Sequence, residues 1–407
     1  MNIDVVVAGG GAAGMMAAIA CKKQGSQVLI LEKKERIGKK ILATGNGKCN
    51  FTNRFQDASC YRSDNEGFPT YALEQFTAED AIAFFEDLGV ISKEKNGYMY
   101  PYSGQAATIL DALRFELERL GVKSILGAEI SKIKREKGGF LVKYGEKAVF
   151  CKKLILTAGG KASPVQGSDG SGFRLAKNLG HSITSLSPAL TGLKASDDFC
   201  KALGGVRNDS TVSLFIDGKF CMKDTGELQL VQYGISGIPV FQICRYAGKA
   251  LLKKRVVTVE VDFFPGIGGK ELEKNLLERK KKFGLNQAEE ALNGLLNKKI
   301  MLVLMKECGI KATQKMKDIS EEKLKAMCFK MKQLIFHITD TNGFENAQVC
   351  AGGIDTTEVE PETMESKLVK NLYFAGEILD VDGICGGYNL QWAWSSGRLA
   401  GISAGRK

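Results

Sequence analysis

The chain has 407 residues, of which 44% are hydrophobic and 25% charged, as expected for a globular protein of two or three domains. Its 57 basic and 46 acidic residues give a net charge of +11, which allows an anionic partner but is better explained by a solvated surface with lysines spread along the chain. Only two histidines are present and no two cysteines are spaced C-x-x-C, so histidine-cluster mechanisms, zinc ribbons and thioredoxin-like redox motifs are excluded.

The first predicted elements form a βαβ unit. Residues 3–8 are an apolar run rich in β-branched residues, and the glycine-rich turn GGGAAG follows at 9–14. A helix is predicted next, ended by Gly25, and residues 27–33 read QVLILEK, which predicts a second buried strand. Glu32 stands near the end of that strand. Strand, glycines, helix, strand and acid together predict a dinucleotide-binding unit.

Each residue type in this G-x-G-x-x-G turn has a physical role. Gly9 permits the tight turn, Gly11 lets the backbone approach a pyrophosphate, and Gly14 lets the helix pack closely on the strand. The N–H groups of Ala12 and Ala13 open the helix and face the phosphates. Glu32 accepts hydrogen bonds from a ribose diol.

A second glycine-rich segment, ILATGNGKCNFTN at 41–53, is not a nucleotide-hydrolysis loop. A P-loop needs glycine five residues before Gly47, where Leu42 stands, and Cys49 replaces the Ser or Thr that would hold magnesium. Cys49 also has no partner at metal-ligand spacing, so no metal site is expected. We interpret the segment as a cofactor-contact loop, with a purely structural glycine loop as the alternative.

Within and beside this loop, several residues are predicted to contact the cofactor. Lys40 or Lys48 would offset pyrophosphate charge. Cys49 and Asn50 would lie along the cofactor toward a flavin, with Cys49 acting as a small packing residue and not as a nucleophile.

The middle of the first domain is predicted from periodicity. Residues 78–90 and 105–121 have the spacing of amphipathic helices. Several strands follow, with hairpin turns at Gly138-Gly139 and Gly145-Glu146. The last of these strands, LILTAGG at 154–160, brings Ala158 and Gly159 to a position where a flavin domain often returns to its cofactor.

The composition changes after residue 185. Residues 186–265 read as short strands with turns, which predicts a mostly β domain inserted into the first fold. Residues 270–332 are rich in lysine and glutamate at helical spacing. The lysine run at 280–282 is typical of a solvated helix face, and a nucleic-acid patch is less favoured because no aromatic residues are interleaved.

The end of the chain supplies a second half of a cofactor site. NLYFAGE is a short apolar strand that ends in Gly376-Glu377, and GGYNLQWAWSSGRLAG reads as a glycine turn that becomes a helix near Asn389 and Leu390. An acid near the strand end suits a ribityl chain. A helix N-terminus suits the pyrimidine carbonyls of a reduced flavin.

The predicted fold is α/β, with a two-segment Rossmann-like FAD-binding domain, an inserted β-rich domain and a nested helical subdomain. Lys33 and Ile130 complete the predicted cofactor-binding set. The expected boundaries are 1–185 and 351–407 for the FAD-binding domain, 186–267 and 333–350 for the β-rich domain, and 268–332 for the helical subdomain.

Motifs along nearly the whole chain resemble the BaiN-like flavoproteins, also described as aminoacetone-oxidase-like FAD-binding enzymes. Two positions depart from that family: Lys48 stands where arginine is frequent, and Ile238 follows the GISG motif where proline is frequent. The matching segments are VVVAGGGAAGMMAA, GKKILATGNGKCNFTN, YPYSGQAATIL, LILTAGGKASP, GSDGSGFRLAKNLGH, QYGISGIP, and AGGIDTTEVEPETMESKL through GGYNLQWAWSSG.

The resemblance implies an FAD-dependent oxidoreductase that reduces C=C bonds, because the family includes enzymes acting on 3-oxo bile-acid intermediates. The expected substrate is a 3-oxo-4,6-diene of the bile-acid or steroid type, with NAD(P)H as a transient electron donor because no second G-x-G-x-x-G unit is visible. Tyr100, Tyr102 and Tyr388 are candidate hydrogen-bond donors or acids, with packing tyrosines as the alternative.

Two other functions stay open at this point. One is an FAD-dependent oxidase or dehydrogenase for an amine or small metabolite, and the other is an RNA-modifying flavoprotein, which the +11 charge suggests. The expected partner is a small molecule, with no nucleic acid and no membrane. Without a signal-peptide pattern or an apolar run of about 18 residues, a cytoplasmic location is expected.

Overall fold

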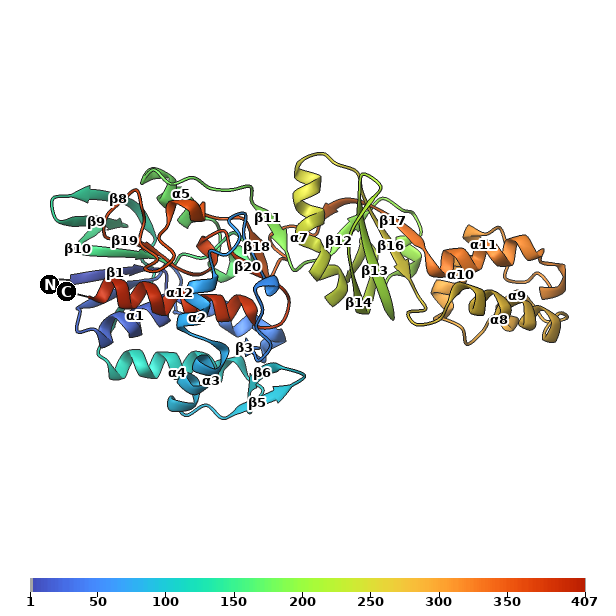
Figure 1. The fold of residues 1–407 in the computed structure, drawn as a ribbon, viewed down its shortest axis with the longest axis horizontal. Helices are drawn as coiled ribbons and strands as arrows, with labels where there is room; N and C mark the ends of the chain where they lie inside the picture. The colour runs from blue at the N-terminus through green and yellow to red at the C-terminus, as the bar shows by residue number, and fades with distance from the viewer. Residues whose placement is uncertain (1–2, 407) are drawn as a thin grey trace. The chain divides into compact units, whose positions relative to one another are not determined.

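The computed structural model describes residues 3–406, which form two compact units, each with its own hydrophobic core (Figure 1). The first unit combines the chain up to Ser187 with the chain from Ala347 onward, and the second is Pro188–Asn346. The predicted α/β class and the two-segment Rossmann-like domain are confirmed. The finer boundaries expected within the second unit stay a prediction.

A seven-stranded sheet forms the centre of the first unit, in the order β7-β2-β1-β10-β9-β8, with β19 pairing β10. β1, β2, β7, β10 and β19 pair in parallel. The parallel-paired residues of the central strands β1, β10 and β19 are mostly buried, as is usual for a parallel sheet covered on both faces, whereas the edge strand β7 is largely exposed. The strands of this sheet are β1 (Ile3–Ala8), β2 (Val28–Leu31), β7 (Lys123–Ile125), β8 (Ile130–Glu136), β9 (Gly139–Tyr144), β10 (Lys147–Leu156) and β19 (Leu372–Phe374).

The other elements of the first unit surround this sheet. The hairpins expected at Gly138-Gly139 and Gly145-Glu146 are confirmed as the β8–β9 and β9–β10 turns. The helices expected at 78–90 and 105–121 are confirmed as α3 and α4. The helices are α1 (Ala12–Lys23), α2 (Thr70–Gln75), α3 (Ala78–Asp87), α4 (Ala106–Arg119), α5 (Ser171–Asn178) and α12 (Tyr388–Gly405), and the smaller strands are β3 (Thr52–Asn53), β4 (Tyr61–Arg62), β5 (Ser92–Lys95), β6 (Tyr98–Pro101), β11 (Ser187–Ala189), β18 (Val349–Ala351) and β20 (Asp382–Gly383).

α1 and α12 lie side by side although they come from opposite ends of the chain (Figure 1). A stripe of glycines on α12 faces α1. An added Cβ would lie 2.5 Å from the Ala13 carbonyl oxygen at Gly397 and 2.3 Å from the Ala17 carbonyl oxygen at Gly401. The two backbones therefore approach as closely as they do only because these positions carry no side chain.

The second unit contains a closed six-stranded antiparallel barrel in the order β12-β15-β14-β13-β16-β17. Four helices, α8 to α11, follow one another in the chain between β16 and β17. The elements are β12 (Leu193–Ala195), β13 (Val206–Ile216), β14 (Lys219–Val231), β15 (Gly234–Gly237), β16 (Val257–Asp262), β17 (Leu334–Thr341), α6 (Cys200–Leu203), α7 (Ile238–Leu252), α8 (Gly269–Lys282), α9 (Ala288–Ala291), α10 (Lys298–Glu307) and α11 (Glu321–Lys332).

The long helix α7 was not predicted. It begins at Ile238, directly after the GISG strand, and its buried residues Val240, Ile243 and Ala247 recur at helical spacing. Because Ile238 occupies the first turn and is 51% exposed, its presence in place of the family's frequent proline changes only the start of this helix.

His181 is a buried histidine in the first unit. His181 Nδ1 lies 3.0 Å from a Glu358 carboxylate oxygen, and Nε2 lies 2.9 Å from Ser366 Oγ. That hydroxyl oxygen already accepts the N–H groups of Leu368 and Val369, so its proton points at Nε2 and the ring is neutral. Burial, partly opposed by Glu358, lowers the pKa of His181.

We therefore expect the free energy of unfolding to fall as the pH drops below about 6.5. In that range the histidine binds a proton in the unfolded chain but stays neutral in the folded chain, where its pKa is lower. Urea unfolding between pH 5 and 7.5 measures this. His181→Gln should flatten the slope. An unchanged slope in His181→Gln would contradict the prediction.

Candidate functional site

A pocket opens in the first unit where the carboxyl ends of β1, β2 and β10 meet the N-terminal ends of α1 and α12. This is the edge at which open parallel sheets bind ligands. The pocket contains about 1320 Å³ of space between protein atoms, part of it open to solvent. Its lining extends from Glu32, after β2, to Glu377, after β19.

The glycines of the first turn fall into two kinds. Gly9 has φ +113°, and a Cβ on it would lie 2.6 Å from the Thr157 carbonyl oxygen. A Cβ on Gly14 would lie 1.9 Å from the Gly9 carbonyl oxygen. A Cβ on Gly11, by contrast, would meet no protein atom within 4 Å. Gly9 and Gly14 are therefore required by packing, while Gly11 keeps space free in the pocket wall.

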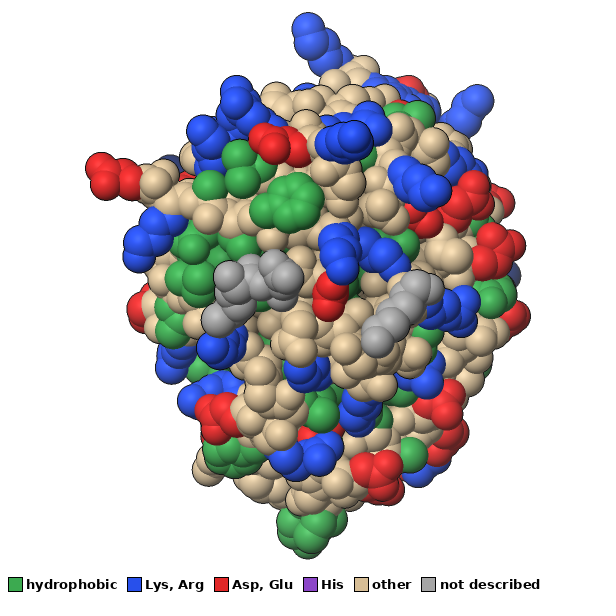
Figure 2. All heavy atoms as spheres, turned by 90° about the vertical axis from the view of Figure 1, so that its left-hand side faces the viewer, with side chains coloured by type: hydrophobic (Ala, Val, Ile, Leu, Met, Phe, Trp, Pro, Cys, Tyr) green, Lys and Arg blue, Asp and Glu red, His purple; other side chains and the backbone are tan. Residues whose placement is uncertain are grey.

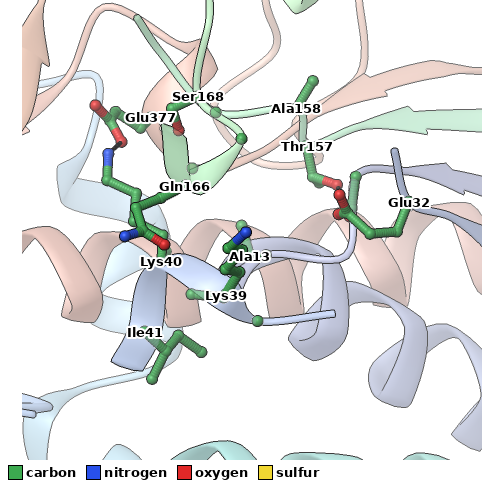
Figure 3. Close-up of a pocket in the computed structure, with 18 of the residues that line it drawn as sticks. Ala13, Glu32, Lys39, Lys40, Ile41, Thr157, Ala158, Gln166, Ser168 and Glu377 are labelled. Carbon is green, nitrogen blue, oxygen red and sulfur yellow. Dashed lines mark hydrogen bonds and ion pairs between the residues drawn. The ribbon is translucent and has the colours of Figure 1, made fainter. Parts of the chain in front are cut away.

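Glu32 is held firmly at one end of the pocket (Figure 3). One of its carboxylate oxygens accepts the Gly10 N–H at 2.7 Å and the other accepts the Lys34 N–H at 2.8 Å. The residue is only 9% exposed. Since a carboxylate has about four lone-pair directions, two remain to accept the hydroxyl groups of a ribose.

We expect Glu32→Gln to weaken FAD binding by about 10-fold to 100-fold, because one amide N–H would then face a backbone N–H and the charged acceptor would be lost. Fluorescence titration of the apoprotein with FAD measures the change. Glu129→Gln is the matched control, since Glu129 also lines the pocket but is exposed. Equal FAD affinity in the two variants would contradict the role of Glu32.

The other end of the pocket carries an ion pair (Figure 3). Lys40 Nζ lies 2.7 Å from a Glu377 carboxylate oxygen, and the second oxygen of Glu377 accepts the Cys350 N–H at 2.9 Å. The 3-10 helix Lys39–Gly47 positions Lys40, and Glu377 lies in the 3-10 turn Gly376–Ile378 shortly after β19. The turn before Glu377 is fixed by the Trp392 indole, which donates to the Gly376 carbonyl.

The N-terminal end of α12 supplies backbone donors to the same pocket. Gly387 caps this helix at φ +95°, where a Cβ would lie 2.7 Å from the Thr52 carbonyl oxygen. The Asn389 side chain makes two hydrogen bonds with the Gly383 backbone: its amide oxygen accepts the Gly383 N–H, and its amide nitrogen donates to the Gly383 carbonyl. Asn389 therefore contributes its first-turn N–H group, as does Leu390. Two helix N-termini, on α1 and α12, thus face one pocket.

The structure brings most of the predicted cofactor residues together. Three predicted residues do not line the pocket: Gly14, Cys49 and Asn50. The pocket lining includes Gly9, Gly11, Ala12, Ala13, Glu32, Lys33, Lys40, Ile130, Ala158, Gly159, Gly376, Glu377, Asn389 and Leu390.

The loop that follows Lys40 is largely exposed up to Lys48 and turns into the protein core only at Cys49. Cys49 is fully buried, and burial raises the pKa of its thiol to about 12, so it packs and does not react. Asn50 Oδ1 is buried without a hydrogen-bond partner among the described residues and lies beside Gly387, at the start of α12. Lys48 is exposed and does not line the pocket.

Lys33 lines the pocket, but its ammonium group pairs with Asp169. Although burial opposes it, hydrogen bonds from Lys33 and Ser171 lower the pKa of Asp169 to about 2. Lys33 therefore offers its aliphatic stem more than its charge to a ligand.

None of the three candidate catalytic tyrosines lines the pocket. Tyr388 is 3% exposed and its ring packs edge-on against Tyr61, while Tyr100 lies half-buried beside Gly45 of the glycine-rich loop. Burial raises the pKa of both Tyr100 and Tyr388, so both phenols keep their protons at neutral pH. Tyr102 is 68% exposed and faces the Lys93 ammonium.

Several pocket residues were not predicted. The Thr157 hydroxyl donates to the Gly9 carbonyl oxygen at 2.8 Å and so ties β10 to the glycine turn. Gln166 and Ser168, from the segment before α5, also line the pocket, as do Lys39 and Trp392. Thr157 lies in the predicted LILTAGG strand, which signals its position. The other contacts depend on loop geometry that no periodicity reveals.

Comparison with known proteins agrees with this geometry. The model of the HI0933-like protein Rossmann domain matches residues 3–403. A 3-dehydro-bile acid delta(4,6)-reductase of Clostridium scindens is 43% identical over 404 residues, covering 98% of each chain. A ribosomal RNA dihydrouridine synthase of Haemophilus influenzae is 31% identical over 409 residues, covering 99% of this chain and 98% of the other. Among solved structures, a 3-ketosteroid-delta4-(5alpha)-dehydrogenase from Rhodococcus jostii is 17% identical, covers 100% of this chain and 97% of that chain, and has a TM-score of 0.49.

Proposed function

The chain belongs to the HI0933-like family of Rossmann-domain proteins, and from this premise we propose that it is an FAD-dependent oxidoreductase that reduces a C=C bond conjugated with a carbonyl group. The observation that carries the proposal is the 43% identity, over 98% of both chains, to an enzyme named as a bile acid delta(4,6)-reductase. The first candidate substrate is accordingly a 3-oxo-4,6-diene of the bile-acid type.

The residues of the pocket fit FAD. Glu32 would accept the hydroxyl groups of the adenosine ribose, and the first-turn N–H groups of α1 beside the open Gly11 position would bind the pyrophosphate. Glu377, at the other end of the pocket, would meet the ribityl chain. The N-terminal end of α12 would stabilise negative charge on the flavin pyrimidine.

When bound, FAD supplies hydride transfer, which no side chain of the protein can provide. The protein's own contribution is to bind and orient the cofactor and to stabilise the substrate carbonyl. Tyr100, Tyr102 and Tyr388 stay the proposed hydrogen-bond or proton donors for a substrate that binds beyond the residues of this pocket, since none of the three lines it. NAD(P)H is proposed as a transient donor of electrons.

An anaerobic experiment tests this function. The purified protein is reduced with NADH or NADPH and mixed with a 3-oxo-4,6-diene bile acid, while flavin absorbance is followed. We expect the oxidised spectrum to return with the diene and not with the saturated 3-oxo compound, since only the former has a C=C bond to reduce. Oxygen uptake with amines and no response to conjugated carbonyl compounds would instead favour an amine oxidase.

Uridine in RNA is a second candidate substrate, because it also carries a C=C bond conjugated with a carbonyl group. The uracil base carries a C=C bond conjugated with its C4 carbonyl, and saturation of that bond gives dihydrouridine, the product that names the Haemophilus influenzae relative. The distribution of charge favours this candidate: 26 basic and 19 acidic residues give Pro188–Asn346 a net charge of +7 out of +11. Ribosomal RNA from cells lacking the modification is the corresponding substrate for the same experiment.

We propose a cytoplasmic location. All eleven cysteines are free thiols, which suits a reducing compartment. Within residues 3–406, no helix has both the length and the apolar character needed to cross a bilayer.

A further inference from the structure

The positive charge of the second unit is concentrated in one segment. Gly269–Lys332, which contains α8 to α11, has 16 basic and 9 acidic residues, a net charge of +7 in 64 residues. The rest of this unit has 10 basic and 10 acidic residues and is neutral. By contrast, basic and acidic side chains are interspersed on the face of the first unit in Figure 2.

Backbone hydrogen bonds gather part of this charge into one cluster. The Lys317 N–H donates to the Gly284 carbonyl at 2.9 Å, and the Ala288 N–H donates to the Gln314 carbonyl at 2.8 Å. The chain after α8 is thereby paired with the chain before α11. We call the lysines thus brought together the basic tip: Lys281, Lys282, Lys311, Lys315 and Lys317.

The basic tip lies at the far end of the helical segment. α8 and α11 run antiparallel, because Cys328 contacts Gly269 near the barrel end while the Lys280 ammonium donates to the Ile319 carbonyl at the other end. Lys281 and Lys282 are the last residues of α8. The cluster therefore projects from the end of the segment opposite to its connection with β16 and β17.

The five lysines are exposed and unneutralised. In the described part of the chain, no carboxylate forms an ion pair with any of them, whereas Lys298, Lys325 and Lys330 elsewhere on these helices are paired with glutamates. Glu290 accepts hydrogen bonds from its neighbours Asn286 and Gln287. Five unpaired ammonium groups held on a fixed backbone form an electrostatic footprint for phosphates.

We infer that the basic tip is a docking surface for the phosphate backbone of RNA, and this inference rests on the second substrate class proposed above. Lysines are point charges that suit phosphates without base specificity. A bilayer surface is less suited, since membrane binding needs a broad apolar face, whereas the loop after α8 offers only the exposed Leu285 and the half-buried Phe283. The inference departs from the expectation of no nucleic-acid partner.

Fluorescence anisotropy with a labelled ribosomal RNA fragment tests the inference on the FAD-loaded 407-residue chain. Five phosphate contacts predict that affinity falls on the order of 100-fold between 50 and 200 mM salt. Alanine at all five lysines should weaken binding at least 10-fold at 50 mM salt and reduce the salt dependence. The control replaces five exposed lysines of the first unit, changing the net charge equally: Lys132, Lys134, Lys137, Lys147 and Lys177.

The outcomes separate this inference from the proposed function. Reduction by NAD(P)H and reoxidation by the diene should be unchanged in the tip variant, because no tip residue lines the FAD pocket. Equal RNA binding by the tip and control variants would overturn the inference. So would binding to vesicles of anionic phospholipid with none to RNA. Loss of RNA binding with intact flavin chemistry supports the inference.

Discussion

Gly11→Val is expected to fold as the wild-type chain does and to purify without yellow colour. A Cβ at Gly11 meets no protein atom within 4 Å, and the backbone there has φ −76°, which valine adopts without strain. The added methyl groups instead occupy the wall of the pocket where a pyrophosphate would lie against the backbone. We expect FAD affinity to fall at least about 100-fold, equivalent to about 2.8 kcal/mol.

The experiment combines flavin absorbance with urea unfolding of the apoproteins. Gly268→Val is the matched control, since its Cβ also meets no atom within 4 Å but lies far along the chain in the second unit; it should keep both FAD and stability. Gly14→Val should fail to fold, because its Cβ would overlap the Gly9 carbonyl oxygen. Stoichiometric FAD in folded Gly11→Val would refute the assignment of this turn.

The first βαβ unit could be predicted because each of its signals is local. A buried β-branched strand, a glycine turn, a helix and a second strand ending in Glu32 follow one another within about 30 residues. The strands and the helix that result are β1, α1 and β2, and Glu32 lines the pocket. Local patterning and tertiary structure agree here, which is typical of segments that fold as one supersecondary unit.

Contacts between distant segments could not be predicted in the same way. Lys40 and Glu377 are 337 positions apart and form one ion pair, while Lys33, predicted to face the cofactor, is paired with Asp169. Which carboxylate a lysine reaches depends on loop paths that periodicity does not encode. The same limit explains why the tyrosines, chosen for their chemistry alone, lie outside the pocket lining.

Helix α7 shows a different limit. Its apolar residues recur at helical spacing and a proline occupies its first turn, so the signal was present in the sequence. Strands precede and follow α7, so the β-rich interpretation of residues 186–265 includes it. The length of the segment distinguishes a helix from a strand here, because α7 has 15 residues and is longer than an ordinary strand.

The contact between α1 and α12 carries the second large prediction. α12 brings the Asn389 and Leu390 N–H groups to the pocket, and its position depends on its approach to α1. At Gly401, a Cβ would lie 2.3 Å from the Ala17 carbonyl oxygen and 2.9 Å from the Ala17 Cα. Backbone atoms of a helix cannot yield as a flexible side chain would, so a larger residue must push the two helices apart.

Gly401→Val is therefore expected to lower the free energy of unfolding by about 3 kcal/mol or more, the upper range for overpacked cores, and to weaken FAD binding in the protein that still folds. Urea unfolding and FAD titration measure the two effects. Ser403→Val introduces the same side chain two residues away on a partly exposed position of α12 and should change stability by less than about 1 kcal/mol. If both variants behaved alike, the close approach of the helices would not be what positions α12.

Bound FAD should also raise the stability of wild type more than that of Gly401→Val, because only a native α12 presents its N-terminal donors to the cofactor.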